Sequence, residues 1–311
     1  MTSPGPTTSL PEPLRQLERG PIFVVGMPRS GTTWVHDLLA SHPQAACVFE
    51  SFLFGEAGLG GFASSMHWRP PAGGGAVGEL VGRERAIADL RTLAAQWLGA
   101  ALEPHHRFLV EKTPSHLYAV DFISQVFPEA TFVHVLRDGR DVVVSWSAAA
   151  TGWASWWRPA LLDVDTAGLA VRVQLPIGPL YTRARAWRGC VDRMRILGER
   201  LGPRLHEVRY EDLRADPLAG TRRLLDFCGM PYDDDLVGRA VEATDLGRLD
   251  HGEGKFRGAG RTGDWQRRFG LLERLAFDRA AGGALLATGY ERSRLWWLPR
   301  RAVGPKPSGT P

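Results

Sequence analysis

The fold of this chain is decided by residues 21–43, which read PIFVVGMPRSGTTWVHDLLASHP. Ile22–Val25 is an apolar, β-branched run typical of a strand buried on both faces. A loop with two glycines follows at residues 26–33, and an amphipathic stretch with helical spacing runs from Trp34 to Ser41. His42-Pro43 ends the helix, because proline cannot continue it. The stretch therefore predicts a strand, a loop and a helix in immediate succession.

The loop has the composition of an anion-binding turn. Gly26 and Gly31 enclose four residues and are followed by Thr32 and Thr33. Glycines let backbone N–H groups turn inward, and the start of the next helix adds the positive end of its dipole. The spacing resembles a Walker A loop, but Thr32 stands where the lysine for the β- and γ-phosphates of ATP is expected. Because Arg29 places a cation inside the loop instead, we expect an anionic ligand other than ATP.

Strands and helices alternate along the rest of the chain. Strands are predicted at residues 108–110, 131–136 and 205–209, and helices at residues 81–102, 117–127, 137–145, 218–227, 235–243 and 271–286. This alternation predicts an α/β fold in which a central, mostly parallel sheet is covered by helices on both faces. The ligand is then expected at the carboxyl ends of the strands.

A single domain over residues 21–290 accounts for the chain, because neither an internal repeat nor a shift in composition marks a second one. Residues 1–20 are interpreted as a disordered lead-in, and residues 300–311, rich in proline and glycine, as a disordered tail. Within the domain we predict a Gly-rich surface excursion at residues 55–78 and a Trp-rich insertion at residues 146–188.

The charge composition favours a small anionic ligand. The chain has 311 residues, 44% hydrophobic and 23% charged, and a formal net charge of +4. Of its 38 basic residues only three are lysines, so the other 35 are arginines, whose planar guanidinium groups bind phosphate or sulfate through paired donors. Basic and acidic residues are interleaved without the polybasic block typical of nucleic-acid-binding arms, so we expect no nucleic acid partner.

The remaining composition indicates a cytoplasmic protein. The three cysteines are too few and too scattered for a disulfide framework or a zinc cluster. No apolar run approaches the roughly 20 residues that a transmembrane helix needs, and the N-terminus lacks the order of a signal peptide. We expect no transmembrane segment.

A second motif, RDGRDVVVS at residues 137–145, follows the strand predicted at residues 131–136. An arginine at the end of a strand, here Arg137, can bind phosphate through two N–H donors, and Ser145, two helical turns later, adds a hydroxyl. An ordinary surface ion pair between Arg137 and Asp138 is the alternative. Beside the first loop, the motif instead indicates a ligand with phosphates at both ends.

The two motifs together resemble those of the sulfotransferases that use 3′-phosphoadenosine 5′-phosphosulfate (PAPS). The first loop is similar to the family's 5′-phosphosulfate loop. Arg29 stands where cytosolic members have lysine, and where tyrosylprotein sulfotransferases and a similar bacterial branch have arginine. Residues 137–145 resemble the family's 3′-phosphate segment. The resemblance implies a P-loop NTPase-like three-layer sandwich, PAPS as co-substrate, adenosine 3′,5′-bisphosphate (PAP) as product, and transfer of a sulfuryl group to a hydroxyl without a metal.

The resemblance also implies which residues bind the nucleotide. Trp34 and Tyr210 match family aromatics near the adenine, although both also fit a core. The stretch RGAGRTGDW at residues 257–265 resembles the family's late loop over the 3′-phosphate, with Gly-Ala-Gly where cytosolic members carry Arg-Lys-Gly. The predicted nucleotide contacts are Arg29, Ser30, Gly31, Thr32, Thr33, Trp34, Arg137, Ser145, Tyr210, Arg257, Gly260 and Arg261.

Sulfuryl transfer requires cations at the oxygens of the moving group and a base for the acceptor proton. Arg29 and Lys112, the latter at the end of a predicted strand, are the candidate cations. His116 lies two residues beyond Pro114, the position of the catalytic histidine in cytosolic members. Glu50 stands as far after Arg29 as the catalytic glutamate of tyrosylprotein sulfotransferases stands after its arginine. We favour Glu50 as base over His116, because it follows a short apolar run that would end at the cleft.

Tryptophans and arginines in the predicted insertion bear on the acceptor. Trp146, Trp153, Trp156, Trp157 and Trp187 indicate an aromatic or amphipathic acceptor, or equally a core under the insertion. Nearby arginines leave a lipid-like acceptor and peripheral membrane contact open. We expect a small-molecule hydroxyl acceptor (aromatic, glycosidic or lipid-like) and a role in secondary metabolism. The sequence leaves open whether the protein forms a homodimer.

Two other function classes compete with this interpretation. A P-loop small-molecule kinase is disfavoured by Thr32, which replaces the Walker A lysine, and by the lack of a convincing Walker B run. A non-catalytic nucleotide-binding module would not need Glu50 and Lys112 at a cleft.

Overall fold

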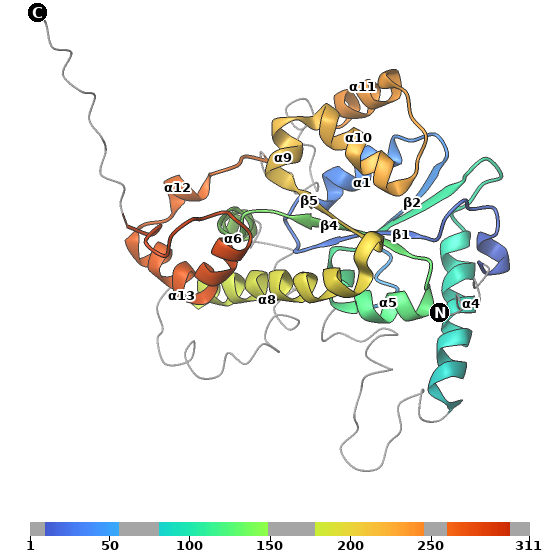
Figure 1. Ribbon diagram of the computed structural model, residues 1–311, viewed down its shortest axis with the longest axis horizontal. Helices are drawn as coiled ribbons and strands as arrows, with labels where there is room; N and C mark the ends of the chain where they lie inside the picture. The colour runs from blue at the N-terminus through green and yellow to red at the C-terminus, as the bar shows by residue number, and fades with distance from the viewer. Residues whose placement is uncertain (1–9, 56–80, 149–177, 246–259, 299–311) are drawn as a thin grey trace, which may run out of the picture.

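Five parallel strands form the centre of the molecule in the computed structural model, which describes residues 10–55, 81–148, 178–245 and 260–298 (Figure 1). The strands are β1 (Ile22–Gly26), β2 (Ala45–Phe49), β3 (Phe108–Lys112), β4 (Thr131–Leu136) and β5 (Leu205–Arg209). Their order in the sheet is β2-β3-β1-β4-β5, and all four pairings are parallel. All five carboxyl ends therefore lie along one edge of the sheet.

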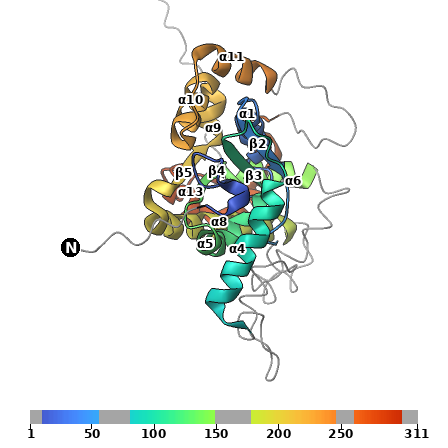
Figure 2. The same cartoon turned by 90° about the vertical axis from the view of Figure 1, so that its right-hand side faces the viewer.

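One face of the sheet is covered by four helices, seen above it in Figures 1 and 2. They are α1 (Thr32–Ala40), α9 (Tyr210–Ala215), α10 (Pro217–Cys228) and α11 (Asp234–Ala243). Ile22 and Val24 of β1 and Val133 and Val135 of β4 point to this face and share a buried cluster with the helices. Because side chains alternate along a strand, the residues between them point the other way.

The opposite face carries a larger core. Its helices include α4 (Arg83–Gly99), α5 (Val120–Val126), α6 (Gly139–Ala148), α8 (Gly178–Leu201), α12 (Trp265–Arg268) and α13 (Leu271–Ala287), with the 3₁₀ turns η1 (Glu12–Leu14), η2 (Pro114–Ala119) and η4 (Gly202–Arg204). Phe23 of β1 stacks on Phe132 of β4 with ring centroids 5.8 Å apart. Phe54 and Phe127 pack against Phe23 at 5.9 and 6.4 Å. Two helical layers around a parallel sheet confirm the predicted α/β architecture.

Most predicted elements are present with small changes at their ends. The strands at residues 131–136 and 205–209 have the predicted limits, and β3 extends two residues further, through Lys112. The helix predicted over residues 117–127 is a 3₁₀ turn followed by α5. Pro114 at the first position of the turn explains why helical structure begins earlier than predicted.

The predicted disordered lead-in, residues 1–20, is wrong for residues 10–20. Leu14 in η1 is fully buried and Leu17 is 6% exposed, and both belong to the larger core. A Cβ on Gly99, at the end of α4, would lie 3.6 Å from Leu14 Cδ2. Leu10, Leu14 and Leu17 recur at helical spacing, so this polar, proline-rich segment presents one apolar side to the domain.

The Trp-rich insertion predicted at residues 146–188 overlaps two helices, the end of α6 and the first 11 residues of the 24-residue helix α8. Trp187 is buried against the core, and its indole Nε1 donates to the carbonyl oxygen of Arg137 at 3.0 Å. Trp153, Trp156 and Trp157 lie outside the described residues, as do the tail (300–311) and the Gly-rich excursion (55–78) apart from Gly55. Within the described ranges, no helix is long and apolar enough to cross a membrane.

Candidate active site

The predicted site residues gather at the carboxyl edge of the sheet. Each strand contributes one: Arg29 follows β1, Glu50 follows β2, Lys112 ends β3, Arg137 follows β4 and Tyr210 follows β5. Parallel pairing aligns these ends, because Val24 of β1 pairs with Lys112 and Phe49 of β2 also pairs with Lys112. This edge is where open α/β sheets bind ligands.

The loop between β1 and α1 has a conformation that requires its glycine. Gly31 has φ of 99°, and a Cβ there would lie 2.4 Å from a ring carbon of Tyr210. Gly31 is also the N-cap of α1 and has no side chain with which to cap the first N–H groups. Arg29 has φ of 77°, which is uncommon for a residue with a side chain and is often found at functional sites. Ser30 and Thr32 are buried within the loop and first turn.

The two predicted anion-binding motifs are joined by direct hydrogen bonds. Arg29 Nε donates to Ser145 Oγ at 3.2 Å, and Arg137 Nη1 donates to the carbonyl oxygen of Arg29 at 3.0 Å. Burial and the neighbouring positive charge of Arg137 lower the pKa of Arg29. Placing two guanidinium groups side by side is electrostatically unfavourable in the absence of an anion.

Arg137 is held by neutral groups. It is only 7% exposed, its Nη2 donates to the carbonyl oxygen of Arg261 at 2.8 Å, and its guanidinium lies 4.4 Å from the centre of the Tyr210 ring. Its Nε is buried and has no hydrogen-bond partner among the described residues. An unpaired buried donor is costly, so this atom is suited to an acceptor oxygen supplied by a ligand.

Trp34 and Tyr210 form one wall of the site. Their rings meet edge to face with centroids 5.6 Å apart, and both are buried. Trp34 Nε1 donates to Thr244 Oγ1 at 3.3 Å, and the Tyr210 hydroxyl donates to the carbonyl oxygen of Gly260 at 2.8 Å. Burial raises the pKa of Tyr210, while Arg137 opposes that shift. Both rings are thus fixed in place beside the arginine pair.

Glu50 and Lys112 form an ion pair on the neighbouring strands. Lys112 Nζ donates to Glu50 Oε1 at 2.7 Å, and the Glu50 backbone N–H donates to the Lys112 carbonyl oxygen at 2.7 Å. Burial lowers the pKa of Lys112 despite the opposing effect of Glu50. Lys112 Nζ also lies 3.4 Å from the centre of the Phe49 ring, which is 54% exposed. Like Arg29, Glu50 has a positive φ, here 53°.

His116 lies in the core beneath the predicted base position. Its Nδ1 is 2.9 Å from Glu111 Oε2, and its Nε2 accepts from the backbone N–H of Phe54 at 3.2 Å. Both side chains of the His116–Glu111 pair are fully buried. The ring nitrogens of His116 are therefore both engaged by the protein, whereas the side chain of Glu50 is 20% exposed.

Three residues of this region were not predicted from the sequence. Glu111 and Asp141 are buried carboxylates that hold backbone and hydroxyl groups of the loops, and Phe49 presents an exposed ring beside Lys112. A charged residue inside an apolar run, such as Glu111 in FLVEK, is a usable signal for a buried carboxylate. Arg257, which was predicted, lies outside the described residues, while Gly260 and Arg261 contact Tyr210 and Arg137 through their carbonyl groups.

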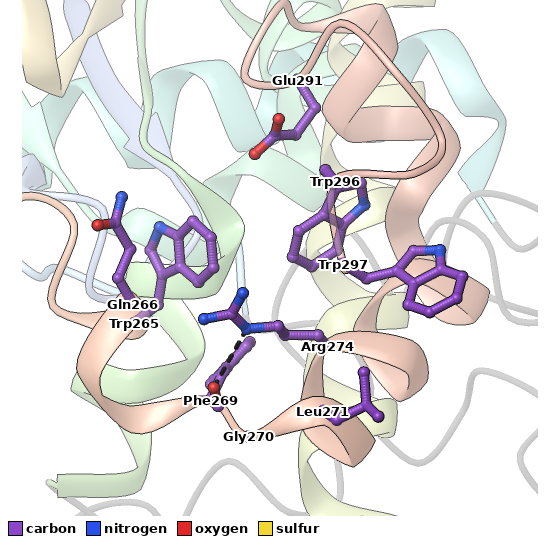
Figure 3. A pocket seen from close by; sticks show the side chains of 9 residues that line it. All are labelled: Trp265, Gln266, Phe269, Gly270, Leu271, Arg274, Glu291, Trp296 and Trp297. Atoms are coloured by element: carbon purple, nitrogen blue, oxygen red, sulfur yellow. Dashed lines mark hydrogen bonds between the residues drawn. The ribbon is translucent and has the colours of Figure 1, made fainter. Parts of the chain in front are cut away.

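A separate hollow of about 520 Å³ lies at the end of the molecule formed by α12, α13 and the segment that follows (Figure 3). Its walls include Trp265, Phe269, Trp296 and Trp297, and Arg274 extends between them with its Nε donating to the Phe269 carbonyl at 3.2 Å. Trp265 connects this hollow to the late loop. Over the described ranges, no three His, Cys, Asp or Glu side chains gather in a way that could hold a metal ion.

Comparison with known proteins identifies sequence relatives. A family model described as the sulfotransferase family matches residues 21–234. The nodulation protein NoeE of Sinorhizobium fredii is 30% identical over 239 residues, which cover 73% of this chain and 54% of that protein. Protein-tyrosine sulfotransferase 1 of Danio rerio is 24% identical over 237 residues, covering 70% of this chain and 57% of that protein. This chain thus spans about half the length of these curated relatives.

A solved structure shows the same fold. A mouse sulfotransferase, SULT7A1, crystallised in complex with PAP, superposes with a TM-score of 0.52 at 13% sequence identity, covering 92% of each chain. The likeness confirms the predicted architecture, a P-loop NTPase-like three-layer sandwich.

Proposed function

The chain belongs to the sulfotransferase family, and we propose that it transfers a sulfuryl group from PAPS to a hydroxyl of an acceptor molecule. The observation that carries this proposal is the joined pair of arginines, the half-buried Arg29 and the buried Arg137, whose Nε has no hydrogen-bond partner among the described residues. Such a pair fits a ligand that carries two anionic groups. The mouse relative in complex with PAP supports this choice of nucleotide.

In this proposal the nucleotide spans the two motifs. The uncapped start of α1 and the Ser30–Thr33 backbone would hold the 5′-phosphosulfate, because N–H groups at a helix N-terminus favour anions. Arg137, Ser145 and the late loop, including Arg261, would hold the 3′-phosphate. The remaining contacts proposed are Trp34 and Tyr210 beside the adenine, Gly260 in the late loop, and Arg257 outside the described residues.

The chemistry proposed at this edge is in-line transfer. The acceptor oxygen forms a bond to sulfur, the bond from sulfur to the 5′-phosphate oxygen breaks, and PAP leaves. Glu50 takes the acceptor proton, while Arg29 and Lys112 stabilise the negative charge on the sulfuryl and leaving oxygens. Most of the catalytic work is then positioning and charge stabilisation, as in phosphoryl transfer.

Geometry supports Glu50 over His116 as the base. A base must reach the proton that it removes, and Glu50 follows β2 at the carboxyl edge of the sheet with part of its side chain exposed. His116 is fully buried, with one nitrogen at Glu111 and the other at Phe54. We assign His116 to the support of the loop that carries Glu50.

The acceptor proposed is a small molecule with an apolar or aromatic part. The exposed ring of Phe49 precedes Glu50 directly and offers a surface for such a group. A protein tyrosine, by analogy with the Danio rerio relative, fits the same chemistry.

Cytoplasmic location, homodimer formation and peripheral membrane contact stay predictions. The kinase alternative is not favoured, because Thr32 leaves the loop without the lysine that ATP requires.

The proposal is tested by titrating the protein with PAP and with ATP, and by following labelled PAPS with a panel of phenols, sugars and lipid-like alcohols. We expect PAP to bind at least about tenfold more tightly than ATP. Glu50→Gln should lower kcat by about 10²–10⁴-fold and leave the PAP dissociation constant within about twofold. The matched control, Glu103→Gln, changes an exposed carboxylate and should change neither quantity. Preference for ATP, or full turnover in Glu50→Gln, contradicts the proposal.

A further inference from the structure

Asp141 joins the 3′-phosphate segment to the late loop. It lies in the first turn of α6, is 2% exposed, and its Oδ2 accepts from the backbone N–H of Gly263 at 2.6 Å. Its Oδ1 accepts from the backbone N–H of Trp265 at 3.0 Å. Burial raises the pKa of Asp141, and the two backbone N–H groups oppose that shift. One carboxylate thus binds the loop at two points.

The same loop also contacts the proposed nucleotide-binding residues. The carbonyl of Arg261 accepts from Arg137, and that of Gly260 accepts from Tyr210. Asp141 is four residues after Arg137 and four before Ser145. Residues four apart in a helix lie on one face, so Asp141 and Ser145 share a face of α6. The loop is therefore fixed to the segment that would hold the 3′-phosphate.

Beyond the loop, Trp265 is anchored to the rest of the domain. The guanidinium of Arg140 lies 3.8 Å from the centre of the Trp265 ring, and the Trp296 ring meets it edge to face at 5.7 Å. Figure 3 shows both indoles among the side chains that line the hollow. Arg140 is itself held by Asp138 and Glu291. The end of the late loop is therefore held both by Asp141 and by the packing of the Trp265 ring.

The negative charge of Asp141 is unfavourable for binding an anion at this place. A negative charge beside an anion-binding arginine weakens anion binding, because like charges repel. The positive charge of Arg137 is close enough to Asp141 to lower the pKa of its carboxyl, against the larger effect of burial. A carboxylate here therefore needs a compensating role, and its two hydrogen bonds to the loop supply one.

We propose that Asp141 is a positioning residue for recognition of the 3′-phosphate. It does not contact the nucleotide but holds residues 260–265 so that Arg261 and Arg137 face the same phosphate. The inference rests on the proposed function, since it presumes that a 3′-phosphorylated nucleotide binds here. It predicts that loss of Asp141 weakens binding only of nucleotides that carry this phosphate.

The test compares PAP with adenosine 5′-phosphosulfate, which lacks the 3′-phosphate, by isothermal titration. In Asp141→Asn the remaining side-chain oxygen can still accept from one of the two backbone N–H groups. The NH2 group that replaces the second oxygen is a donor and cannot accept from the other. We expect the PAP dissociation constant to rise about tenfold and that of adenosine 5′-phosphosulfate to change less than about twofold. With PAPS as substrate, KM should rise by a similar factor, with kcat changed by less than about threefold.

Two further variants separate positioning from charge and from folding. Asp264 lies in the same loop, and its carboxylate pairs with Arg268. The PAP affinity of Asp264→Asn should therefore equal or exceed that of the unmodified protein. Gly263 has φ of 77°, so Gly263→Ala strains the backbone, although the added methyl group meets no close neighbour. This variant leaves the charge unchanged and should also raise the PAP dissociation constant. Its effect should not add to that of Asp141→Asn, because both release the same loop.

The outcomes are distinguishable. Unchanged or tighter PAP binding in Asp141→Asn overturns the inference, since charge would then outweigh positioning. An equal loss for both nucleotides also overturns it, because Asp141 would then support only the fold. Failure of the unmodified protein to bind PAP overturns the proposed function, and the inference with it.

Discussion

Glu111 and Lys112 are adjacent in β3 but serve different parts of the site. Lys112 reaches Glu50, whereas Glu111 accepts hydrogen bonds from Ser51 and Thr113 and contacts His116. The segment after β2 is backbone-strained, since Glu50 and Phe52 have φ of 53° and 50°. The backbone N–H groups of this segment donate to side chains of the buried cluster. Those of Ser51, Phe52 and Phe54 donate to Glu111, Thr113 and His116, respectively. This buried polar cluster therefore holds Glu50 in its strained position.

At this scale we predict that Glu111→Gln destabilises the protein at pH 7 by about 3–5 kcal/mol, because it breaks a buried hydrogen-bonded pair. Urea denaturation followed by circular dichroism measures the change. The exposed helical variant Glu199→Gln is the control and should stay within about 0.5 kcal/mol. A loss below about 1 kcal/mol would show that the cluster does not support the loop.

The same carboxyl gives the stability a defined dependence on pH. Burial alone raises the pKa of Glu111, but His116, Thr113 and Ser51 outweigh it and lower the pKa below its ordinary value. A lowered carboxyl pKa stabilises the folded state fully above the unfolded-state value of about 4.3, and this contribution is lost as pH falls through the folded-state pKa. The acid-side loss of stability should therefore be smaller in Glu111→Gln than in the unmodified protein.

At the scale of elements, the turn from β1 into α1 depends on contact with α9. Gly31 precedes α1 with φ of 99°, and Tyr210, the first residue of α9, lies directly against it. We predict that Gly31→Ala lowers the free energy of unfolding by about 1–3 kcal/mol and weakens PAP binding, since the new methyl group displaces Tyr210.

Calorimetric melting and PAP titration measure both effects of Gly31→Ala. Gly189→Ala is the control, because Gly189 lies within α8 with open space around its Cα. There alanine should stabilise the protein by about 0.5–1 kcal/mol. Equal effects of the two substitutions would contradict the role of close contact at Gly31.

The elements themselves were largely predictable, and the side-chain pairings were not. Local patterns predicted β4, β5 and the loop before α1, because their periodicity and glycine spacing are set by adjacent residues. The whole of α8 was missed, because its first turns are rich in arginine and residues up to 188 were attributed to an insertion. The contacts of Glu111 with Ser51 and of Asp141 with Gly263 join positions 60 and 122 residues apart, and no local pattern reports them.

At the scale of the whole molecule, the N-terminal segment completes the larger core. Leu14 is fully buried beside the end of α4. We predict that Leu14→Ala costs about 2–5 kcal/mol of stability, as for other buried leucines, with the PAP dissociation constant unchanged below the melting temperature. Leu272→Ala, at a site 63% exposed, should change stability by less than about 0.5 kcal/mol. Similar losses for both would refute core burial of Leu14.

The bonding of Arg137 also has a kinetic consequence. Two of its donors end on the carbonyl oxygens of Arg29 and Arg261, which carry no formal charge, so these hydrogen bonds form no ion pair, and the carboxylate of Asp141 offsets part of its positive charge. The part of the charge that Asp141 leaves uncompensated attracts an approaching polyanion over roughly one Debye length, about 8 Å at physiological ionic strength. Capture of the nucleotide becomes partly an electrostatically steered encounter, whose association rate falls as salt is added.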